Sequence, residues 1–308
     1  MPHRIATRQV NFLPALCVLV AASLVSNLGS LMTAKYDELP YFDDPPVIET
    51  VLGVFFRPVR NFNSVWQGTY WNECLKSDLS DFDLRPPIEE IPERFGPAPV
   101  SSGPVFRWEV ADAPETPRLW AKWPSGERIF QVQRNALMSN WLRPKGSTEY
   151  RRFSARLQEL GDRYQQFSEF VAKYKLNEDQ PLTPTSCSAT YINHIQADSW
   201  SAALERTLTR WSSKGSDDWL PPVEQGRLQF SFAFPNQGRL HVTAMSVIQR
   251  ESKQPVLQLE FTARLVLAKE KCALEDVLQA VATGHEWIVR GFTSLTTPEM
   301  HATWRRSQ

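Results

Sequence analysis

The sequence predicts an α+β fold built from a pseudo-duplicated unit, with a curved, antiparallel-rich sheet covered by two long helices. Two stretches, residues 150–174 and 274–295, carry apolar residues at helical spacing over many turns. Runs rich in β-branched and aromatic residues precede each stretch and indicate strands. Each half reads as strand, helix, three strands and long helix. Because open edges are a liability, we expect the two units to join into one sheet.

The first half is expected to begin with a strand at Val47–Phe56, which is rich in β-branched and aromatic residues. Asn61 or Asn63 is expected to cap the helix that follows, because asparagine accepts hydrogen bonds from free amides at a helix start. The apolar face of this helix is expected to hold Phe62, Val65, Trp66, Thr69, Tyr70 and Leu75.

A segment dense in proline and acidic residues follows at residues 78–104 and shows no periodicity. Long loops without secondary structure are either solvated connectors or functional elements such as lids. We therefore expect an extended surface loop, which is a plain connector or, as the alternative, a lid or partner-binding strap.

Three strands then lead to the first long helix. We expect them at Val105–Val110, Arg118–Trp123 and Arg128–Leu142, with a tight turn at Pro124–Gly126 between the last two. The helix carries an aromatic stripe from Tyr150 to Tyr174. Two-stranded coiled coils prefer Leu, Ile and Val at their seam, so the stripe favours packing on a sheet over the alternative, a homodimer seam.

The second half is expected to repeat this order. Its elements are a strand at Ser186–Ile195, a helix at Trp200–Trp211, strands at Leu228–Phe234, Leu240–Gln249 and Val256–Leu267, and a long helix at Leu274–Leu295. Thr297 and Pro298 are typical of a cap and a first turn, so a short last helix is expected through Trp304.

The predicted organisation is an apolar extension at residues 1–31, a first half at 39–180 and a second half at 181–308. Residues 10–34 contain no charged side chain. Three interpretations compete: a cleaved signal peptide, an uncleaved anchor through residues 10–32, or a true translation start at Met32. A start at Met32 predicts a cytoplasmic protein, and the anchor predicts an inner-membrane one.

Composition narrows the function. The 34 Lys and Arg residues balance 34 Asp and Glu residues, and a net charge of zero disfavours a dedicated nucleic-acid-binding domain. We expect a protein partner or a small ligand, and no cofactor. The cysteines show no CxxC pair and no zinc-ligand spacing, so we expect reduced thiols; they are Cys17, Cys74, Cys187 and Cys272.

The sequence contains no Walker loop, GxGxxG, GxSxG or HExxH motif, so it matches none of the readily recognised enzyme classes. The weak catalytic candidates are Glu49, Asn193, His194, His285 and Glu286. A metal site at His285, Glu286 and His301 is not expected, because Pro298 separates the two histidines and metal ligands usually have tighter spacing.

Glu49 shares a strand face with apolar side chains, which indicates either a functional carboxylate or a structural ion pair. We expect the ion pair, with Arg134 or Arg143 as its partner, because buried acids are seldom left unpaired. Tryptophans also alternate with basic residues on the middle strands, at Trp108, Trp120, Trp123 and Trp141.

Such aromatic and basic side chains either stack on a planar ligand or pack the sheet beneath the long helix. We expect packing. The candidate binding residues are Arg134, Trp141 and Arg143.

Several short motifs occur together: Leu39-Pro40 with Pro45–Glu49, Gln131–Arg134 with Asn140–Arg143, Thr190–Ile195, and His285–Ile288 with Phe292–His301 and Trp304. In this combination the chain resembles a sporadically distributed, uncharacterised bacterial family over residues 39–306. The resemblance supports Met32 as the start, since members begin just before the Leu-Pro pair. It implies no activity, but a sporadic distribution suggests an accessory role in defence or in a mobile element.

Three functions therefore remain open. The preferred one is a non-enzymatic intracellular binding or adaptor protein that uses the sheet face or the proline-rich loop. The second is an enzyme with a polar pocket around Glu49, Asn193, His194 and His285. The third is a membrane-anchored protein held through residues 10–32.

Overall fold

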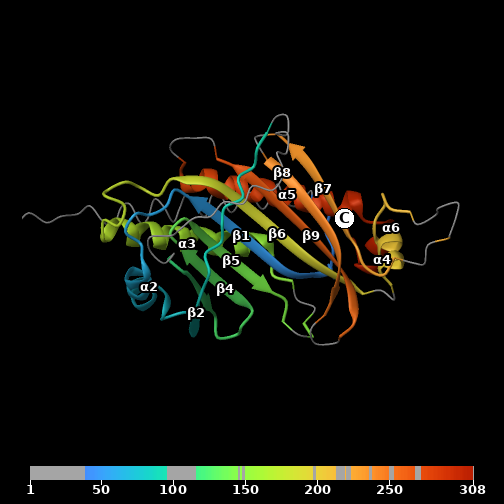
Figure 1. Cartoon of the computed structure of the whole chain (residues 1–308), viewed down its shortest axis with the longest axis horizontal. Helices are drawn as coiled ribbons and strands as arrows, with labels where there is room; N and C mark the ends of the chain where they lie inside the picture. The colour runs from blue at the N-terminus through green and yellow to red at the C-terminus, as the bar shows by residue number, and fades with distance from the viewer. Residues whose placement is uncertain are drawn as a thin grey trace, which may run out of the picture. The chain divides into compact units, whose positions relative to one another are not determined.

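A computed structural model gives the structure of the chain (Figure 1). It describes residues 39–95, 116–144, 146–147, 150–196, 199–212, 219, 223–235, 238–249, 253–267 and 272–307. The extension at residues 1–31, Trp108 and the strand expected at Val105–Val110 lie outside these residues. Within the described part of the chain, no helix is both long enough and apolar enough to cross a membrane.

Nine strands form one sheet in the order β2-β3-β4-β5-β1-β6-β9-β8-β7, and neighbouring strands are antiparallel. The strands are β1 (Val47–Phe56), β2 (Asp81–Arg85), β3 (Arg118–Lys122), β4 (Arg128–Gln133), β5 (Ala136–Leu142), β6 (Pro184–Gln196), β7 (Arg227–Phe234), β8 (Gly238–Ile248) and β9 (Pro255–Val266). The predicted α+β class, with an antiparallel sheet, is therefore confirmed.

The described helices lie between these strands along the chain, except that the last two follow β9. They are α2 (Ser64–Tyr70), the π-helical turn η1 (Trp71–Leu75), α3 (Phe153–Lys173), α4 (Trp200–Thr207), α5 (Leu274–Leu295) and α6 (Pro298–Thr303). Thr297 caps α6 by accepting a hydrogen bond from the Met300 amide, and Pro298 occupies its first turn.

The long helices α3 and α5 pack on one face of the sheet, which we call the helix face (Figure 1). Phe56 of β1 lies on this face with its ring 5.8 Å from that of Phe167 on α3. Phe62 and Tyr70 surround the same Phe167 ring. The aromatic stripe of α3 therefore builds the core of the first half, because these rings are buried against the sheet.

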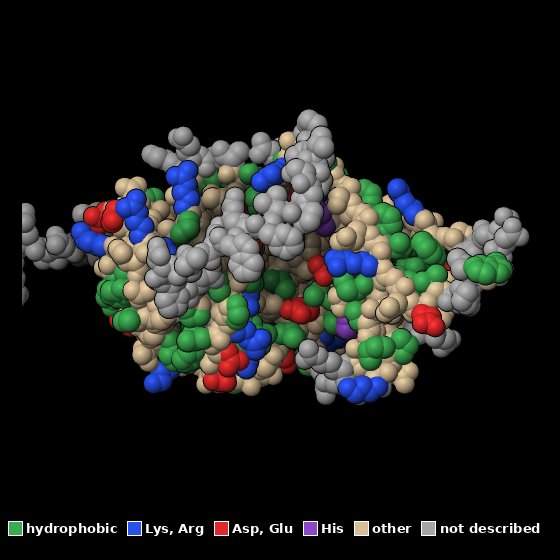
Figure 2. Space-filling view, viewed as in Figure 1, with side chains coloured by type: hydrophobic (Ala, Val, Ile, Leu, Met, Phe, Trp, Pro, Cys, Tyr) green, Lys and Arg blue, Asp and Glu red, His purple; other side chains and the backbone are tan. Residues whose placement is uncertain are grey.

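The opposite face of the sheet, which we call the open face, is reached by alternate side chains of each strand. On β1 these include Val51 and Phe55, and Val51 lies level with Asn140 of β5 and Thr190 of β6. Figure 2 shows this face, where charged side chains of both signs surround a hollow. The open face therefore mixes apolar positions such as Val51 and Phe55 with polar ones such as Asn140 and Thr190.

Two expectations about the strands are wrong. The strand expected at residues 128–142 is a hairpin, β4 and β5, which turns at Arg134 and Asn135. Asparagine favours turns, and strands usually span roughly 3–10 residues. In the described part of the loop expected at residues 78–104, Asp81–Arg85 forms the edge strand β2, which was not predicted because it has no β-branched residue. Residues 96–104 of that loop lie outside the described residues.

The cap expected for α2 is correct, and so is its apolar face, except for Val65. Asn63 Oδ1 accepts hydrogen bonds from the amides of Val65 at 3.1 Å and Trp66 at 3.3 Å. Val65 itself is 76% exposed. The buried positions of α2 are Gln67 and Tyr70, so the helix presents a narrower face to the core than the sequence pattern suggests.

Candidate binding site

Residues 86–95 run across the open face without regular secondary structure (Figure 1). We call this segment the strap. Among the described residues, no backbone–backbone hydrogen bond involves it. Side chains of the sheet hold it instead, at three successive points that lie over β4 and β5, over β6, and over β8 and β9.

The first point is Ile88. Its amide donates a hydrogen bond to Gln133 Oε1 at 2.8 Å, and its carbonyl accepts one from Gln133 Nε2 at 2.7 Å. The Ile88 side chain packs on a small apolar cluster of Phe55, Ala136 and Met138. The side-chain amide of Gln133 thus binds the backbone of the strap, and the apolar cluster packs against the Ile88 side chain.

The second point is Glu90. The Ser186 hydroxyl donates a hydrogen bond to Glu90 Oε1 at 2.6 Å. The Thr185 hydroxyl lies 3.3 Å from the same oxygen and 3.4 Å from the other. Two neutral donors at the start of β6 therefore hold this carboxylate.

The third point is Glu93, whose side chain is only 5% exposed. Arg239 of β8 donates to its carboxylate at 2.6 Å and Arg264 of β9 at 3.3 Å. His241 Nε2 lies 2.5 Å from Glu93 Oε1, and its Nδ1 lies 3.0 Å from the Ser231 hydroxyl. We call Arg239, His241 and Arg264 the basic site.

The basic site stabilises the charged form of Glu93. Burial alone would raise the pKa of this carboxyl group. The hydrogen bond and charge of His241 and the charge of Arg239 outweigh burial, so the pKa of Glu93 lies below its usual value. The site is therefore a receptor for a carboxylate anion.

The centre of the open face carries a second polar network, around Glu49. Asn140 Nδ2 donates to Glu49 Oε1 at 2.7 Å, and Gln131 Nε2 donates to Asn140 Oδ1 at 2.6 Å. Burial and the negative charge of Glu260 raise the pKa of Glu49, while the Asn140 hydrogen bond opposes the rise. Gln131 Oε1 is buried and has no hydrogen-bond partner among the described residues.

The expected ion pair between Glu49 and Arg134 or Arg143 is not what the structure contains. Arg143 instead donates to the Pro45 carbonyl at 2.6 Å and lies 3.4 Å from Asp44. Arg134 stands in the β4–β5 turn, where its Nε donates to the Val59 carbonyl at 3.4 Å. Each arginine links two chain segments, and the side-chain amide of Asn140 is the partner of Glu49 instead.

The weak catalytic candidates divide between the two faces of the sheet. Glu49 and His194 lie on the open face, where His194 Nε2 is 3.3 Å from Gln258 Oε1. Asn193 and His285 lie on the helix face, where Asn193 donates to the Leu259 carbonyl at 2.9 Å. Glu286 pairs with Arg290 on α5. The sheet separates the two groups, so they do not form one pocket.

His285 is enclosed by aromatic groups. Its ring stacks on Phe153 at 3.8 Å, and its Nδ1 lies 2.9 Å from the Tyr191 hydroxyl. Burial lowers the pKa of His285 to about 3, so the ring is neutral at physiological pH. His301 lies apart from it, 2.8 Å from the Thr296 hydroxyl. No cluster of metal-ligating side chains occurs among the described residues.

The tryptophans make contacts with basic side chains. Arg85 lies 3.8 Å above the Trp120 ring, and Arg128 lies 4.3 Å from the Trp123 ring. Trp141 is buried on the helix side with its ring 5.5 Å from Tyr150. Cation–π contacts within the protein therefore already occupy Trp120 and Trp123.

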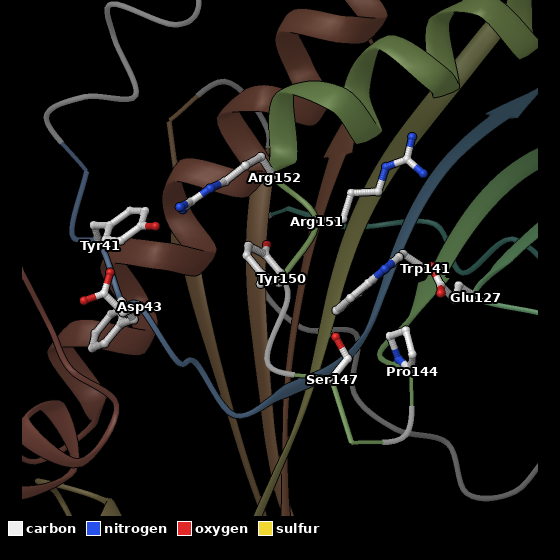
Figure 3. Close-up of a pocket in the computed structure, with 10 residues that line it drawn as sticks. Tyr41, Asp43, Glu127, Trp141, Pro144, Ser147, Tyr150, Arg151 and Arg152 are labelled. Carbon is white, nitrogen blue, oxygen red and sulfur yellow. The ribbon is translucent and has the colours of Figure 1, made fainter. Parts of the chain in front are cut away.

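A pocket of about 600 Å³ lies beyond the end of β5 (Figure 3). Tyr41 and Asp43 stand on one side of it and Glu127 and Trp141 on the other, with Tyr150 between them. Two arginines line it, but each has a partner: Arg151 is 3.1 Å from Glu159, and Arg152 lies 4.2 Å from the Tyr41 ring.

The arginines of this pocket are therefore committed to groups of the protein itself. The three contact points under the strap, in contrast, hold an extended segment without regular secondary structure, as a peptide-binding surface does. We accordingly take the open face as the candidate binding site.

The basic site was not predicted from the sequence. Two signals existed: Arg239 and His241 alternate along a strand with an apolar opposite face, and Arg264 does the same on the next strand. Their convergence depends on the register of β8 and β9, which the sequence alone does not give.

Comparison with protein-family models found no match, and comparison with curated proteins found none either.

Proposed function

We propose that this protein is a non-enzymatic binding protein, an adaptor whose open sheet face takes an extended segment of a partner protein. The observation that carries the proposal is the strap. Sheet side chains hold an extended stretch of chain at three points, without a single backbone–backbone hydrogen bond to it among the described residues. A surface that holds one extended segment in this way has the chemistry to hold another.

We also infer that the wide open face results from a duplicated fold, as the sequence pattern predicts. The order β3-β4-β5-β1 in the first half has the same connectivity as β7-β8-β9-β6 in the second half. Each half then ends in a long helix, α3 or α5. The accessory role suggested by the resemblance to a sporadic bacterial family fits an adaptor, which needs a surface and no catalytic group.

The enzyme alternative has less support. It requires Glu49, Asn193, His194 and His285 to lie within hydrogen-bond reach of one reacting group, and their side chains divide between two faces. The membrane-anchored alternative rests on residues 10–32, which are not among the described residues.

A selection from a displayed library of random peptides tests the proposal. The selected peptides are then measured against two bulky substitutions. Ser188→Trp fills the open face between Gly53 and Arg264, and Ser154→Trp is an exposed control on α3. Both variants are first checked for wild-type melting behaviour.

We expect peptides that bind the wild type and the Ser154→Trp variant equally and lose about tenfold or more in affinity for the Ser188→Trp variant. An absence of enriched peptides would count against the proposal. So would peptides that bind both variants equally well, because their site would then lie elsewhere.

A further inference from the structure

We propose that the open face recognises an acidic extended peptide with an apolar residue followed by acids two and five positions later, and that the strap occupies this site in cis. The inference rests on the proposed function and specifies its ligand. In the strap these positions are Ile88, Glu90 and Glu93. Each of the three is read by different side chains of the sheet.

The apolar position fixes which residue of the bound peptide lies opposite Gln133. Gln133 accepts a hydrogen bond from the Ile88 amide and donates one to the Ile88 carbonyl, besides one to Asn135 Oδ1, so any residue except proline at this position keeps these contacts. The cluster of Phe55, Ala136 and Met138 then selects an apolar side chain, because a polar one would be desolvated against it. Backbone reading combined with a side-chain pocket is typical of peptide recognition.

The basic site selects the last acid. Arg239 and Arg264 are directly opposite each other in the β8–β9 ladder, and like charges at opposite positions destabilise a sheet. An anion between them removes this repulsion, and Glu93 supplies it. If the strap leaves, two guanidinium groups and His241 are left without their carboxylate, and the site has a strong affinity for another.

Neutral hydroxyls select the middle acid. Ser186 and Thr185 donate hydrogen bonds to Glu90 but carry no charge, so this position contributes less than the basic site. The spacing of three contacts on one extended segment favours a peptide over a nucleic acid strand. The proteins that bind such strands track phosphates with a positive groove, and here one site is apolar and one is neutral.

The strap is thus an internal competitor. It is joined covalently to β2, so its effective concentration at the site is high, in the millimolar range for short flexible connections. A partner peptide binds when it displaces the strap, and weakening the strap strengthens binding of the partner.

Fluorescence anisotropy of a labelled peptide with the sequence of residues 85–95 tests this inference on the full chain. The peptide is titrated with the wild type, with Glu93→Gln and with Glu89→Gln, a control on an exposed residue of the same strap. We expect Glu93→Gln to bind the peptide about tenfold more tightly than the wild type, because its own strap competes less. The control should bind as the wild type does.

Two further variants make the result specific. A peptide carrying Gln in place of Glu93, and the Arg264→Gln substitution in the Glu93→Gln chain, should each weaken binding about tenfold. Equal binding of the Gln-substituted and unsubstituted peptides would overturn the inference, as would equal affinities of the wild type and Glu93→Gln. If library peptides bind the open face but lack this pattern, only this inference fails. If no peptide binds at all, the proposed function fails with it.

Discussion

Arg239 of β8 and Arg264 of β9 lie directly opposite each other, and both guanidinium groups bind the carboxylate of Glu93. Opposite arginines repel each other, so an anion between them stabilises this arrangement. The anion comes from the strap, which makes no backbone–backbone hydrogen bond within the part of the chain that the structure describes. The stability of the sheet therefore depends on whether the strap is bound to the open face.

Replacing Glu93 by Gln should weaken the attachment of the strap to the sheet without releasing it, because the contacts of Ile88 and Glu90 remain. The substitution keeps the size of the side chain but removes the charge that the three basic groups share. We expect the free energy of unfolding to fall by about 1–3 kcal/mol, since a charge-assisted contact is lost and two arginines lose their anion. Chemical denaturation measures this change. Glu89→Gln is the matched control, and an equal loss there would contradict the assignment.

Replacing Glu159 by Gln should destabilise the helix face more strongly. Glu159 accepts a hydrogen bond from Ser139 at 2.9 Å and pairs with Arg128 and Arg151, each at 3.1 Å. It also lies 3.5 Å from Arg156, which is buried. Breaking a buried pair leaves an uncompensated charge, so we expect a loss of about 3–5 kcal/mol.

The control for Glu159 is the exposed pair of Arg60 and Glu178. Exposed ion pairs contribute about 0–1 kcal/mol, so Glu178→Gln should change the melting temperature little. Similar effects of the two substitutions in denaturation experiments would show that the contacts of Glu159 do not stabilise the packing of α3 on the sheet.

His285 should make the protein sensitive to acid. Its folded pKa of about 3 lies below its ordinary value of 6.5, so the unfolded chain binds a proton more readily. Stability is therefore complete above pH 6.5 and falls as the pH drops, by about 1.4 kcal/mol per pH unit. His285→Gln cannot take up this proton.

The variant loses the stacking of His285 on Phe153, so it should be less stable near neutral pH by about 1 kcal/mol. The gap in melting temperature between wild type and variant should close within about one pH unit below 6.5 and then reverse. A gap that stays constant across this range would show that another group governs acid unfolding.

Glu49 should have the opposite dependence on pH. Its folded pKa is raised above 4.5, so its contribution to stability is present below that pH and is lost as the pH rises through the folded pKa. Glu49→Gln keeps the acceptor for Asn140 without the charge. We expect the variant to gain stability relative to the wild type at neutral pH, because Gln carries no charge for burial to penalise. Calorimetry of both proteins below pH 4.5 and at neutral pH measures this difference. Equal stability of the two at neutral pH would contradict the raised pKa of Glu49.

Much of the fold could be predicted because periodicity is a local property. The apolar stripe of α5 and the cap at Thr297 can be read from neighbouring residues. The β4–β5 turn at Arg134 and Asn135 was missed because it contains neither glycine nor proline. β2 was missed because its pairing with β3 compensates for a weak strand composition.

The candidate site could not be predicted, since it depends on contacts between residues far apart in the sequence. Glu93 meets Arg239 and Arg264 only through the order and register of β8 and β9. Conversely, Asn193 and His194 are neighbours in the sequence, but alternation along β6 sends them to opposite faces. Residue types alone therefore suggested a pocket that the strand geometry divides.

A partner peptide is expected to displace the strap from the open face. The most direct test is the exchange rate of the Ile88 amide, measured by NMR in the ¹⁵N-labelled Glu93→Gln chain with and without the unlabelled peptide of residues 85–95. This amide donates to Gln133 while the strap is bound, so displacement should expose it and speed its exchange. An exchange rate that stays the same at saturating peptide would contradict the claim, because the strap would then still lie on the open face.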